Sequence, residues 1–178
     1  TNDASVYLMN VHATGDINFG ENTMAEILYS NGDVTLTGFS QASVINALGD
    51  VTLSSEIHFF LGGATAQNIY ANGDAILSGG DTTNVNVLGS ITQTSGSHGQ
   101  LIANQTVDIS GPSASPLRFR RTNLISEINA GDDITITSDV QVNSILGKSD
   151  IYCPGVSWSS FNSVAVEGAA HTCPPEAD

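Results

Sequence analysis

The feature that most constrains this chain is a turn sequence that recurs at a nearly fixed interval. It reads NGDV at 31, LGDV at 48, NGDA at 72 and LGSI at 88, and a short apolar/polar alternation follows each copy. Similarity at a fixed period of this length is typical of a solenoid, in which each repeat forms one winding. Successive turn positions lie 16 or 17 residues apart except across two longer intervals: Gly15, Gly32, Gly49, Gly73, Gly89, Gln105 and Asp132, with Gly147, 15 residues further on, as the next.

Alternation on both sides of each turn predicts two strands that direct side chains inward. Val34 and Leu36 follow one turn, and Val51 and Leu53 stand at the same places after the next. Residues two apart on a strand share a face, so these side chains should stack as neighbours in one parallel row. A second row precedes each turn, with a large residue and then a small one, as in Ile45 and Ala47.

A winding of about 17 residues has room for three short strands at roughly 3.3 Å per residue. We therefore expect an all-β, single-stranded parallel β-solenoid of triangular cross-section, with about eight coils. Right-handed winding follows from the general rule for parallel crossovers, to which left-handed solenoids are known exceptions. The third side is less regular, and Met24, Phe39 and Ala42 are candidates to fill it. The expected organisation is a solenoid over residues 1–152, with inserted loops near 55–67 and 111–124, and a C-terminal cap over 153–178.

The charge of the chain excludes one class of partner. Four basic residues stand against 18 acidic ones, for a formal net charge of −14, so binding to nucleic acid is not expected. No stretch has the length and apolarity of a membrane span. The chain begins at Thr1 without methionine or a basic-then-apolar leader, so we expect a removed signal peptide or a segment of a longer protein.

Cys153 and Cys173 are the two cysteines, and both lie in the final stretch. In an oxidising compartment they would close a loop of about 20 residues, worth about 3 kcal/mol if unstrained. Two free thiols or half of a metal site are the alternatives, although the paired short spacing of a zinc site is missing. A disulfide predicts a secreted or cell-surface protein.

The INALGDVTL type of coil resembles the repeats of bactofilins and of other right-handed β-solenoids, including segments of large bacterial surface and pilus-associated proteins. The resemblance covers residues 6 to 152, and it implies a rigid rod that polymerises. Bactofilins are cytoplasmic and lack a cysteine-bearing tail, so this chain departs from them in compartment and at its C-terminal end.

A file of outward hydroxyls is the first candidate site. It resembles the Thr-x-Thr faces of ice-binding β-solenoids, although Asn18, Ile76 and Asp108 interrupt it. The alternative is plain β-propensity, because threonines pair well across a ladder. The file consists of Thr35, Thr37, Thr52, Ser54, Thr92, Thr94, Thr135 and Thr137, with Ser78 and Ser110 in the same column.

A column of aspartates after the turns is the second candidate. Neighbouring windings lie roughly 4.8 Å apart, so stacked carboxylates repel unless something offsets their charge. Each carboxylate could accept backbone N–H groups of its own turn, or the column could hold Ca²⁺. No other cofactor is expected. The column contains Asp16, Asp33, Asp50 and Asp74, and Asp133 further along.

Three of the four basic residues, Arg118, Arg120 and Arg121, fall in one expected loop. They could dock on an acidic surface of the next subunit or on a carboxylated glycan. A local salt-bridge cluster with Glu127 or the aspartates is the equal alternative.

Outward aromatic and amide side chains form the last candidate, three residues before the turn positions. Tyr29 and Tyr70 lie two windings apart and could form a shallow surface that stacks against sugars or a partner. The alternative is strand filler with hydrogen-bonded amide stacks. The full set is His12, Tyr29, Asn46, Tyr70, Asn86 and Asn129.

Catalytic patterns are weak in this sequence, so we expect no enzyme. Lys148 is the single lysine, the histidines His12, His58, His98 and His171 are scattered, and no Gly-x-Ser-x-Gly elbow occurs. The first coil shows no evident cap, which favours head-to-tail self-association, although removal of an upstream domain would leave the same exposed edge. The sequence therefore predicts an extracellular structural or adhesive subunit of a surface filament or adhesin, with ice binding and glycan binding as alternative functions.

Overall fold

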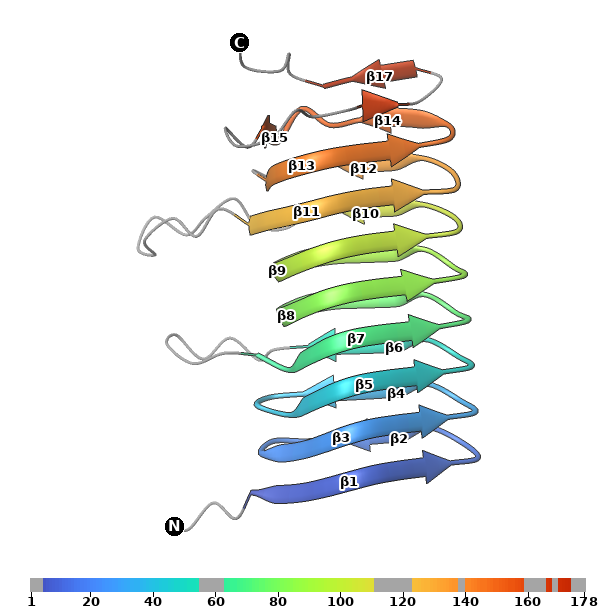
Figure 1. Cartoon of the computed structure of the whole chain (residues 1–178), viewed down its shortest axis with the longest axis vertical. Helices are drawn as coiled ribbons and strands as arrows, with labels where there is room; N and C mark the ends of the chain where they lie inside the picture. The colour runs from blue at the N-terminus through green and yellow to red at the C-terminus, as the bar shows by residue number, and fades with distance from the viewer. Residues whose placement is uncertain are drawn as a thin grey trace.

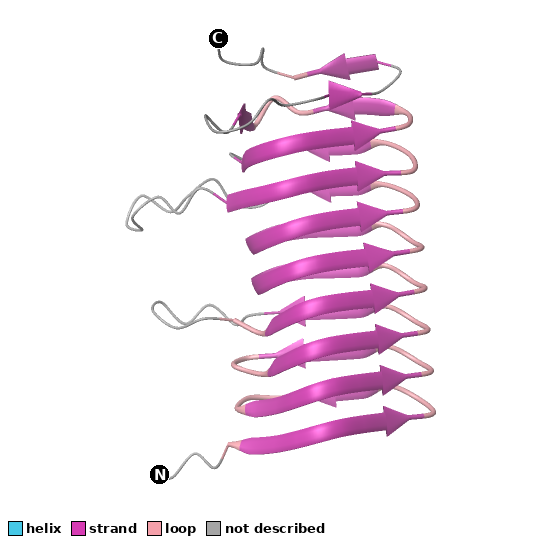
Figure 2. Cartoon of the chain, in the orientation of Figure 1, coloured by secondary structure: helices cyan, strands magenta, loops and turns pink. Residues whose placement is uncertain are grey.

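The computed structural model is a single stack of parallel strands, which confirms the expected fold class (Figure 1). It describes residues 5–54, 63–110, 123–137, 140–158, 166–167 and 170–173, and in these ranges it contains strands and turns but no helix (Figure 2). The chain makes about seven turns, and each winding pairs with its neighbours in the stack. The hand of the winding stays a prediction.

The sheet contains 17 strands among the described residues. They are β1 (Val6–Ala13), β2 (Ile17–Phe19), β3 (Thr23–Ser30), β4 (Val34–Thr37), β5 (Gln41–Ala47), β6 (Val51–Ser54), β7 (Thr65–Ala71), β8 (Ala75–Val87), β9 (Ile91–Ala103), β10 (Val107–Ile109), β11 (Asn123–Ala130), β12 (Ile134–Ile136), β13 (Val140–Gly147), β14 (Asp150–Tyr152), β15 (Val156–Trp158), β16 (Val166–Glu167) and β17 (Ala170–Thr172). The long strands β8 and β9 each continue over more than one side of the winding.

The register of the ladders matches the two predicted inward rows. Val34 pairs with Val51 and Leu36 with Leu53, as neighbours on β4 and β6. Leu28 pairs with Ile45 across β3 and β5, in the row that precedes the turns. These side chains are all fully buried. Equivalent positions of successive windings therefore stack in one continuous core, as the alternation predicted.

A third inward row arises because each long strand bends once. Ala25 and Leu28 are both buried although they lie three residues apart, and the pairing of β3 with β5 is interrupted at Glu26. Strict alternation cannot bury residues three apart, so the strand must turn between them. Three inward rows are what a three-sided winding requires. Ala25, Ala42, Ala66, Thr82 and His98 occupy successive places in the third row.

Two expectations about this third side were wrong. Met24 is only half-buried, because its neighbour Ala25 takes the inward place, while Ala42 is buried as expected. Phe39 is also half-buried and lies at the turn before β5. Small side chains suit this row in the early windings because the bulky rows on the other two sides already fill the narrow interior.

The last predicted turn position was also wrong. Gly147 pairs with Ala130, two residues before the turn, so it lies at the end of β13. Ser149 stands at the turn instead, and Asp150 continues the aspartate column.

The predicted bounds of both inserts reach too far towards the C-terminus, because the next strand begins inside each of them. Residues 65–67 of the first belong to β7, and residues 123–124 of the second belong to β11. The parts of these inserts at 55–62 and 111–122 lie outside the described residues.

The C-terminal stretch carries the predicted disulfide. Cys153 is bonded to Cys173, with 4.6 Å between their Cα atoms. The half-cystine at 153 is fully buried in the core, and β14 pairs with β17 just beside the bond. Among the described residues, none forms a helix long and apolar enough to cross a membrane.

Candidate functional sites

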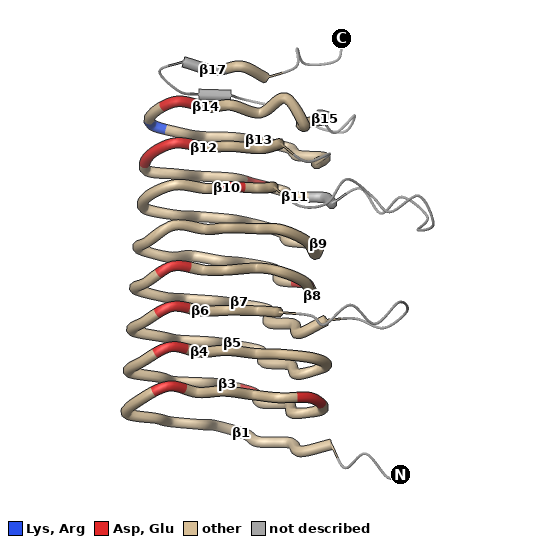
Figure 3. The backbone as a smooth tube through the Cα atoms, turned by 180° about the vertical axis from the view of Figure 1, so that it is seen from behind, with Lys and Arg blue, Asp and Glu red and all other residues tan. Residues whose placement is uncertain are grey.

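The aspartate column runs along one corner of the stack, where the backbone tube is red in Figure 3. Each carboxylate accepts a backbone N–H, but from the next winding rather than from its own turn as predicted. The Asp50 N–H donates to Asp33 Oδ1 at 2.8 Å, and the Asp74 N–H donates to Asp50 Oδ1 at 2.8 Å. The same bond joins Asp33 to Asp16, Ser90 to Asp74 and Asp150 to Asp133. The carboxylates therefore connect successive windings.

Crowding by these carboxylates and by the backbone of the preceding winding accounts for the glycines of the same corner. A Cβ at Gly49 would overlap Asp33 Oδ1, and Cβ atoms at Gly32, Gly73 and Gly89 would overlap the aspartate of the preceding winding in the same way. Ser90 and Thr106 replace aspartate in two windings, and the turns that follow them carry Gln105 and Asp132 instead of glycine. Ser149, which follows Asp133, is the exception.

Calcium binding by Asp16, Asp33, Asp50 and Asp74 stays a prediction. In the described part of the chain, no group of three or more histidine, cysteine, aspartate or glutamate side chains could together hold a metal ion. One oxygen of each of these carboxylates already accepts a backbone hydrogen bond. The negative charge of the column is thus offset at least in part by N–H dipoles.

The hydroxyl file lies on the side formed by β4, β6, β8, β9, β10 and β12. Thr35 pairs directly with Thr52, but Ile76 and Asp108 interrupt the column before Thr92 and Thr135 respectively. In the parallel column the Thr37 hydroxyl donates to the carbonyl of Phe19 at 3.2 Å. Ser54 pairs with Ser78 in that column.

The place of Thr94 in this file was wrong. A register shift after Leu77 pairs Ser78 with Ser95, so Thr94 falls out of the column. Thr137 is exposed at the end of the file, beyond β12. The array is therefore neither continuous nor uniform, and ice binding stays a prediction.

Arg118, Arg120 and Arg121 lie outside the described residues, as does His58. Glu127, their suggested ion-pair partner, accepts a hydrogen bond of 2.5 Å from the Gln100 amide on the neighbouring strand.

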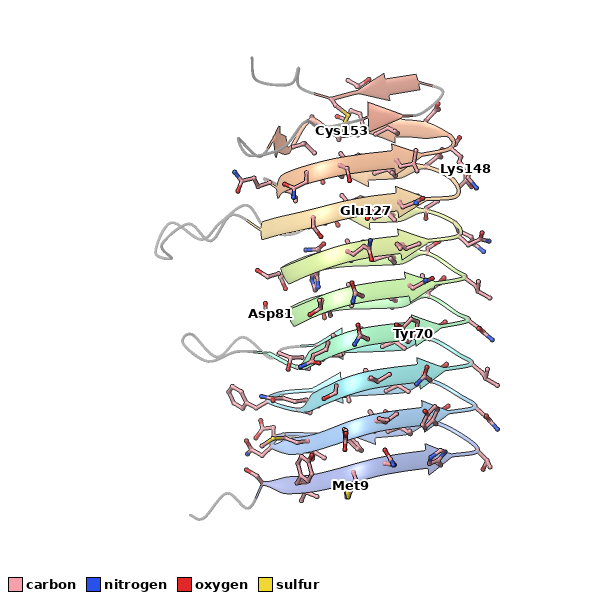
Figure 4. The ribbon with its side chains drawn as sticks, viewed as in Figure 1. Met9, Tyr70, Asp81, Glu127, Lys148 and Cys153 are labelled. Atoms are coloured by element: carbon pink, nitrogen blue, oxygen red, sulfur yellow. A yellow bond between two sulfur atoms is a disulfide. The ribbon has the colours of Figure 1, made fainter. Side chains whose placement is uncertain are left out.

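The aromatic and amide column is confirmed as a single row on the outer face of β1, β3, β5, β7 and β8. His12 pairs with Tyr29, Tyr29 with Asn46, Asn46 with Tyr70, and Tyr70 with Asn86. Asn129 stands further along the row, with Ile102 between it and Asn86. Figure 4 labels Tyr70 within this row.

This row lines one wall of a shallow groove of about 620 Å³. The other wall consists of the residues that protrude at the corner two positions later in each winding: Thr14, Asn31, Leu48, Asn72 and Leu88. The rings of His12 and Tyr29 stack with 4.6 Å between their centroids and 18° between their planes. The sequence indicated the row but not the groove, because the corner residues that line the other wall belong to a separate outward column.

A buried polar cluster inside the winding of β8 and β9 was not predicted. His98 is buried in the third inward row, with its Nδ1 atom 2.8 Å from the Thr82 hydroxyl and its Nε2 atom 3.2 Å from the Ser95 carbonyl. Burial lowers the pKa of His98, against smaller raising effects of the Ser95 carbonyl and of Asp81. The ring is therefore neutral, with Nε2–H donating to Ser95 and Nδ1 accepting from Thr82.

Gln93 is the other buried polar side chain of this winding. Its amide nitrogen donates to the Gly96 carbonyl at 3.4 Å, and its Oε1 atom has no hydrogen-bond partner in the described protein. It replaces an aliphatic residue in a row where Leu77 precedes it and Ile109 follows it.

Comparison with known proteins found no matching family model, no matching curated protein and no matching solved structure. The resemblance to bactofilin-type repeats is therefore supported at the level of a parallel β-solenoid and no further.

Proposed function

We propose that this chain is a structural and adhesive solenoid of the cell exterior, a rod-like subunit that associates head to tail in a filament or adhesin. The proposal assigns it no catalytic activity. The observation that carries it is the first described winding, in which one edge of β1 has no strand partner among the described residues.

Strand β1 pairs with β3 on one edge, and no described residue pairs with its other edge. Its side chains Tyr7 and Met9 are each 66% exposed, and Val6 is 49% exposed. Leu8 and Val11 face the core but are only partly buried, whereas Ala25 and Leu28 at the same places in the next winding are buried. A free strand edge beside exposed apolar side chains is a template for another chain.

The opposite end of the stack differs from this one. There β13 pairs with the short strands β15 and β16, and the disulfide ties β14 to the segment that follows β17. Contact between these unlike ends is heterologous, and a heterologous contact that does not close continues as a filament. The disulfide supports an oxidising, extracellular location.

Self-association is tested with Tyr7→Lys/Met9→Lys, which places two charges on the free edge. The control is Ile76→Lys/Leu88→Lys, which makes the same change of charge at two exposed apolar residues in the middle of the stack, away from both ends. We expect concentration-dependent association of the native chain by light scattering, with rods in negative-stain images. The edge variant should dissociate at least about tenfold more readily than the control, because a charge must lose its water at the contact.

Two outcomes would contradict the proposal. One is a native chain that stays monomeric at all concentrations and salt conditions. The other is a closed dimer, which would mean that like ends meet and no filament forms.

A further inference from the structure

The outer groove between the Tyr29–Asn86 row and the corner carries a pattern that neither wall shows alone. In the winding of β3 the wall positions are Tyr29 and Asn31, and in the winding of β5 they are Asn46 and Leu48. The next two windings repeat this order, with Tyr70 and Asn72 followed by Asn86 and Leu88. Every winding thus offers one apolar and one amide side chain, and their places exchange from each winding to the next.

The apolar members of this pattern are unusually exposed. Tyr29 is 40%, Leu48 58%, Tyr70 46% and Leu88 57% exposed, whereas the inward residues beside them are buried. These four exposed apolar side chains all line the same groove. The groove volume of about 620 Å³ lies in the range of roughly 300–1,000 Å³ common for ligand sites.

The electrostatics of the groove differ from those of the rest of the chain. In a protein with a net charge of −14, the described side chains that line it include no acid, and His12 is their one titratable base. The aspartate column runs beside it, two residues beyond Asn31 and Asn72. That column repels anions from the groove. An anion is therefore disfavoured, and because no described carboxylate lines the groove to pair with a cation, the ligand that fits best is neutral.

The spacing of the pattern identifies the shape of this ligand. Windings lie roughly 4.8 Å apart, so the pattern repeats after roughly 9.6 Å, and the row from His12 to Asn86 is roughly 19 Å long. A ligand that matches it is a straight polymer whose units advance by about one winding and turn over at each step. A β-1,4-linked chain of hexopyranoses has this geometry, with sugar faces that stack on aromatic rings and hydroxyls that pair with amides.

The aromatic ring at the start of the groove is held in place. His12 stacks on one face of Tyr29 with 4.6 Å between the ring centroids, so the neighbouring winding restricts the tyrosine ring. Because Asn46 is small, it leaves space between the two tyrosines, with an amide at its base. A fixed ring loses little conformational freedom when a ligand stacks on it.

The geometry points to a carbohydrate-binding groove for a neutral β-1,4-linked glycan, which lies along the solenoid axis across Tyr29, Asn46, Tyr70 and Asn86. This site lies on the side of the rod, away from the free edge of β1. It therefore does not depend on self-association.

Titration calorimetry on the whole chain tests the site with cellohexaose as the probe. Maltohexaose, an α-linked curved isomer, and an oligogalacturonate of similar length, which is anionic, are the control ligands. We expect cellohexaose to bind and both controls to bind at least about tenfold more weakly. Binding of none of them, or equal binding of all three, would overturn the proposal.

The variants Tyr29→Ala and Tyr70→Ala should each weaken cellohexaose binding about tenfold, because each removes one stacking face. Tyr152→Ala is the matched control, since Tyr152 is similarly exposed but lies on the hydroxyl-bearing side. Leu48→Asn, which removes the alternation without touching a tyrosine, should also weaken binding. Circular dichroism verifies the fold of each variant.

Light scattering on the same variants separates this site from a contact between copies. If Tyr29→Ala reduced self-association and left cellohexaose binding unchanged, the groove would be an interface between copies and the proposal would fail. Loss of assembly in Tyr7→Lys/Met9→Lys with glycan binding retained would leave the groove assigned and concern only the rod.

Discussion

Two turns of the same winding are built on different principles. At the glycine-aspartate corner, one pair of residues recurs from winding to winding, and each aspartate accepts the N–H of the next. At the bend where β8 and β9 pass from their first side to their third, the backbone turns through Gly80 and Gly96, with φ angles of +80° and +103°. No repeated side chain marks this bend. Repeated carboxylate to N–H hydrogen bonds stabilise the first turn, whereas the second depends on glycines with positive φ angles in these two windings.

The difference extends to what lies inside each turn. Behind the glycine-aspartate corner the core is mainly aliphatic, with Leu28 and Val34 fully buried and Ser30 as a buried polar residue that bonds to the turn backbone. Behind the bend lie the buried Thr82, Gln93 and His98. The glycine-aspartate corner has the same structure in several windings, whereas the bend at Gly80 and Gly96 concentrates polar groups and backbone strain in one part of the stack. Substitutions at the bend should therefore cost more than substitutions at the corner.

The largest expected effect is that of Gly80→Ala. The φ angle of +80° disfavours any residue with a side chain, and a Cβ there would overlap the backbone carbonyl of Ala64 in the preceding winding. Because backbone rather than a flexible side chain blocks the space, we expect a loss of about 3 kcal/mol or more in the free energy of unfolding. Urea denaturation followed by circular dichroism measures it.

Gly20→Ala is the control for this prediction. A Cβ at Gly20 would have no heavy atom within 4 Å, and its φ angle is not positive. Its stability should change by less than about 0.5 kcal/mol. Equal losses at Gly20 and Gly80 would mean that the bend is not a strained, fitted turn.

The two turns also differ in how far the sequence predicts them. The corner could be predicted because NGDV and LGDV mark it directly, and the rows of Val34 and Leu28 follow from alternation on either side. The prediction failed at Gly147 because glycine was taken as the marker, whereas Asp150 carries the inter-winding bond and Ser149 takes the turn.

The bend and the groove could not be predicted in the same way. Thr82 and His98 share the third row with Ala42, but the strand bends before reaching them, so two-residue alternation does not place them inside. The sequence predicted that each aspartate accepts N–H groups of its own turn. Each aspartate instead accepts the N–H of the next winding, and only the stacking of the windings brings that N–H within reach. The groove is lined by two outward columns, the Tyr29–Asn86 row and the corner residues. Alternation along a strand predicts each column separately and does not predict that the two line one groove.

A smaller effect is expected at the corner, for Gly49→Ala. Its Cβ would displace the Asp33 carboxylate, which accepts the Asp50 N–H at 2.8 Å. Loss of that bond should cost about 1–2 kcal/mol. Asp33→Ser removes the obstructing carboxylate, as in the natural pair in which Ser90 precedes Gln105.

A double-mutant cycle sharpens this prediction. Gly49→Ala/Asp33→Ser should lose about 1 kcal/mol less than the sum of the two single variants, because the carboxylate can be lost only once. Gly15→Ala/Asp33→Ser is the control pair, since a Cβ at Gly15 meets no atom within 4 Å. Strict additivity in the first pair would show that the carboxylate is not the reason for glycine at this corner.

The smallest effect is a pH dependence that belongs to the bend alone. Burial holds the pKa of His98 below its ordinary value of 6.5, so the folded chain keeps the ring neutral while the unfolded chain protonates it as the pH falls through 6.5. The unfolded state then binds more protons, and stability decreases from above pH 7 towards the lower pKa of the folded state. His98→Gln cannot be protonated and should flatten this part of the profile of melting temperature against pH. If the native chain and His98→Gln have parallel profiles between pH 5 and 8, the buried imidazole is not what makes the bend sensitive to acid, and the contrast between the two turns reduces to backbone strain.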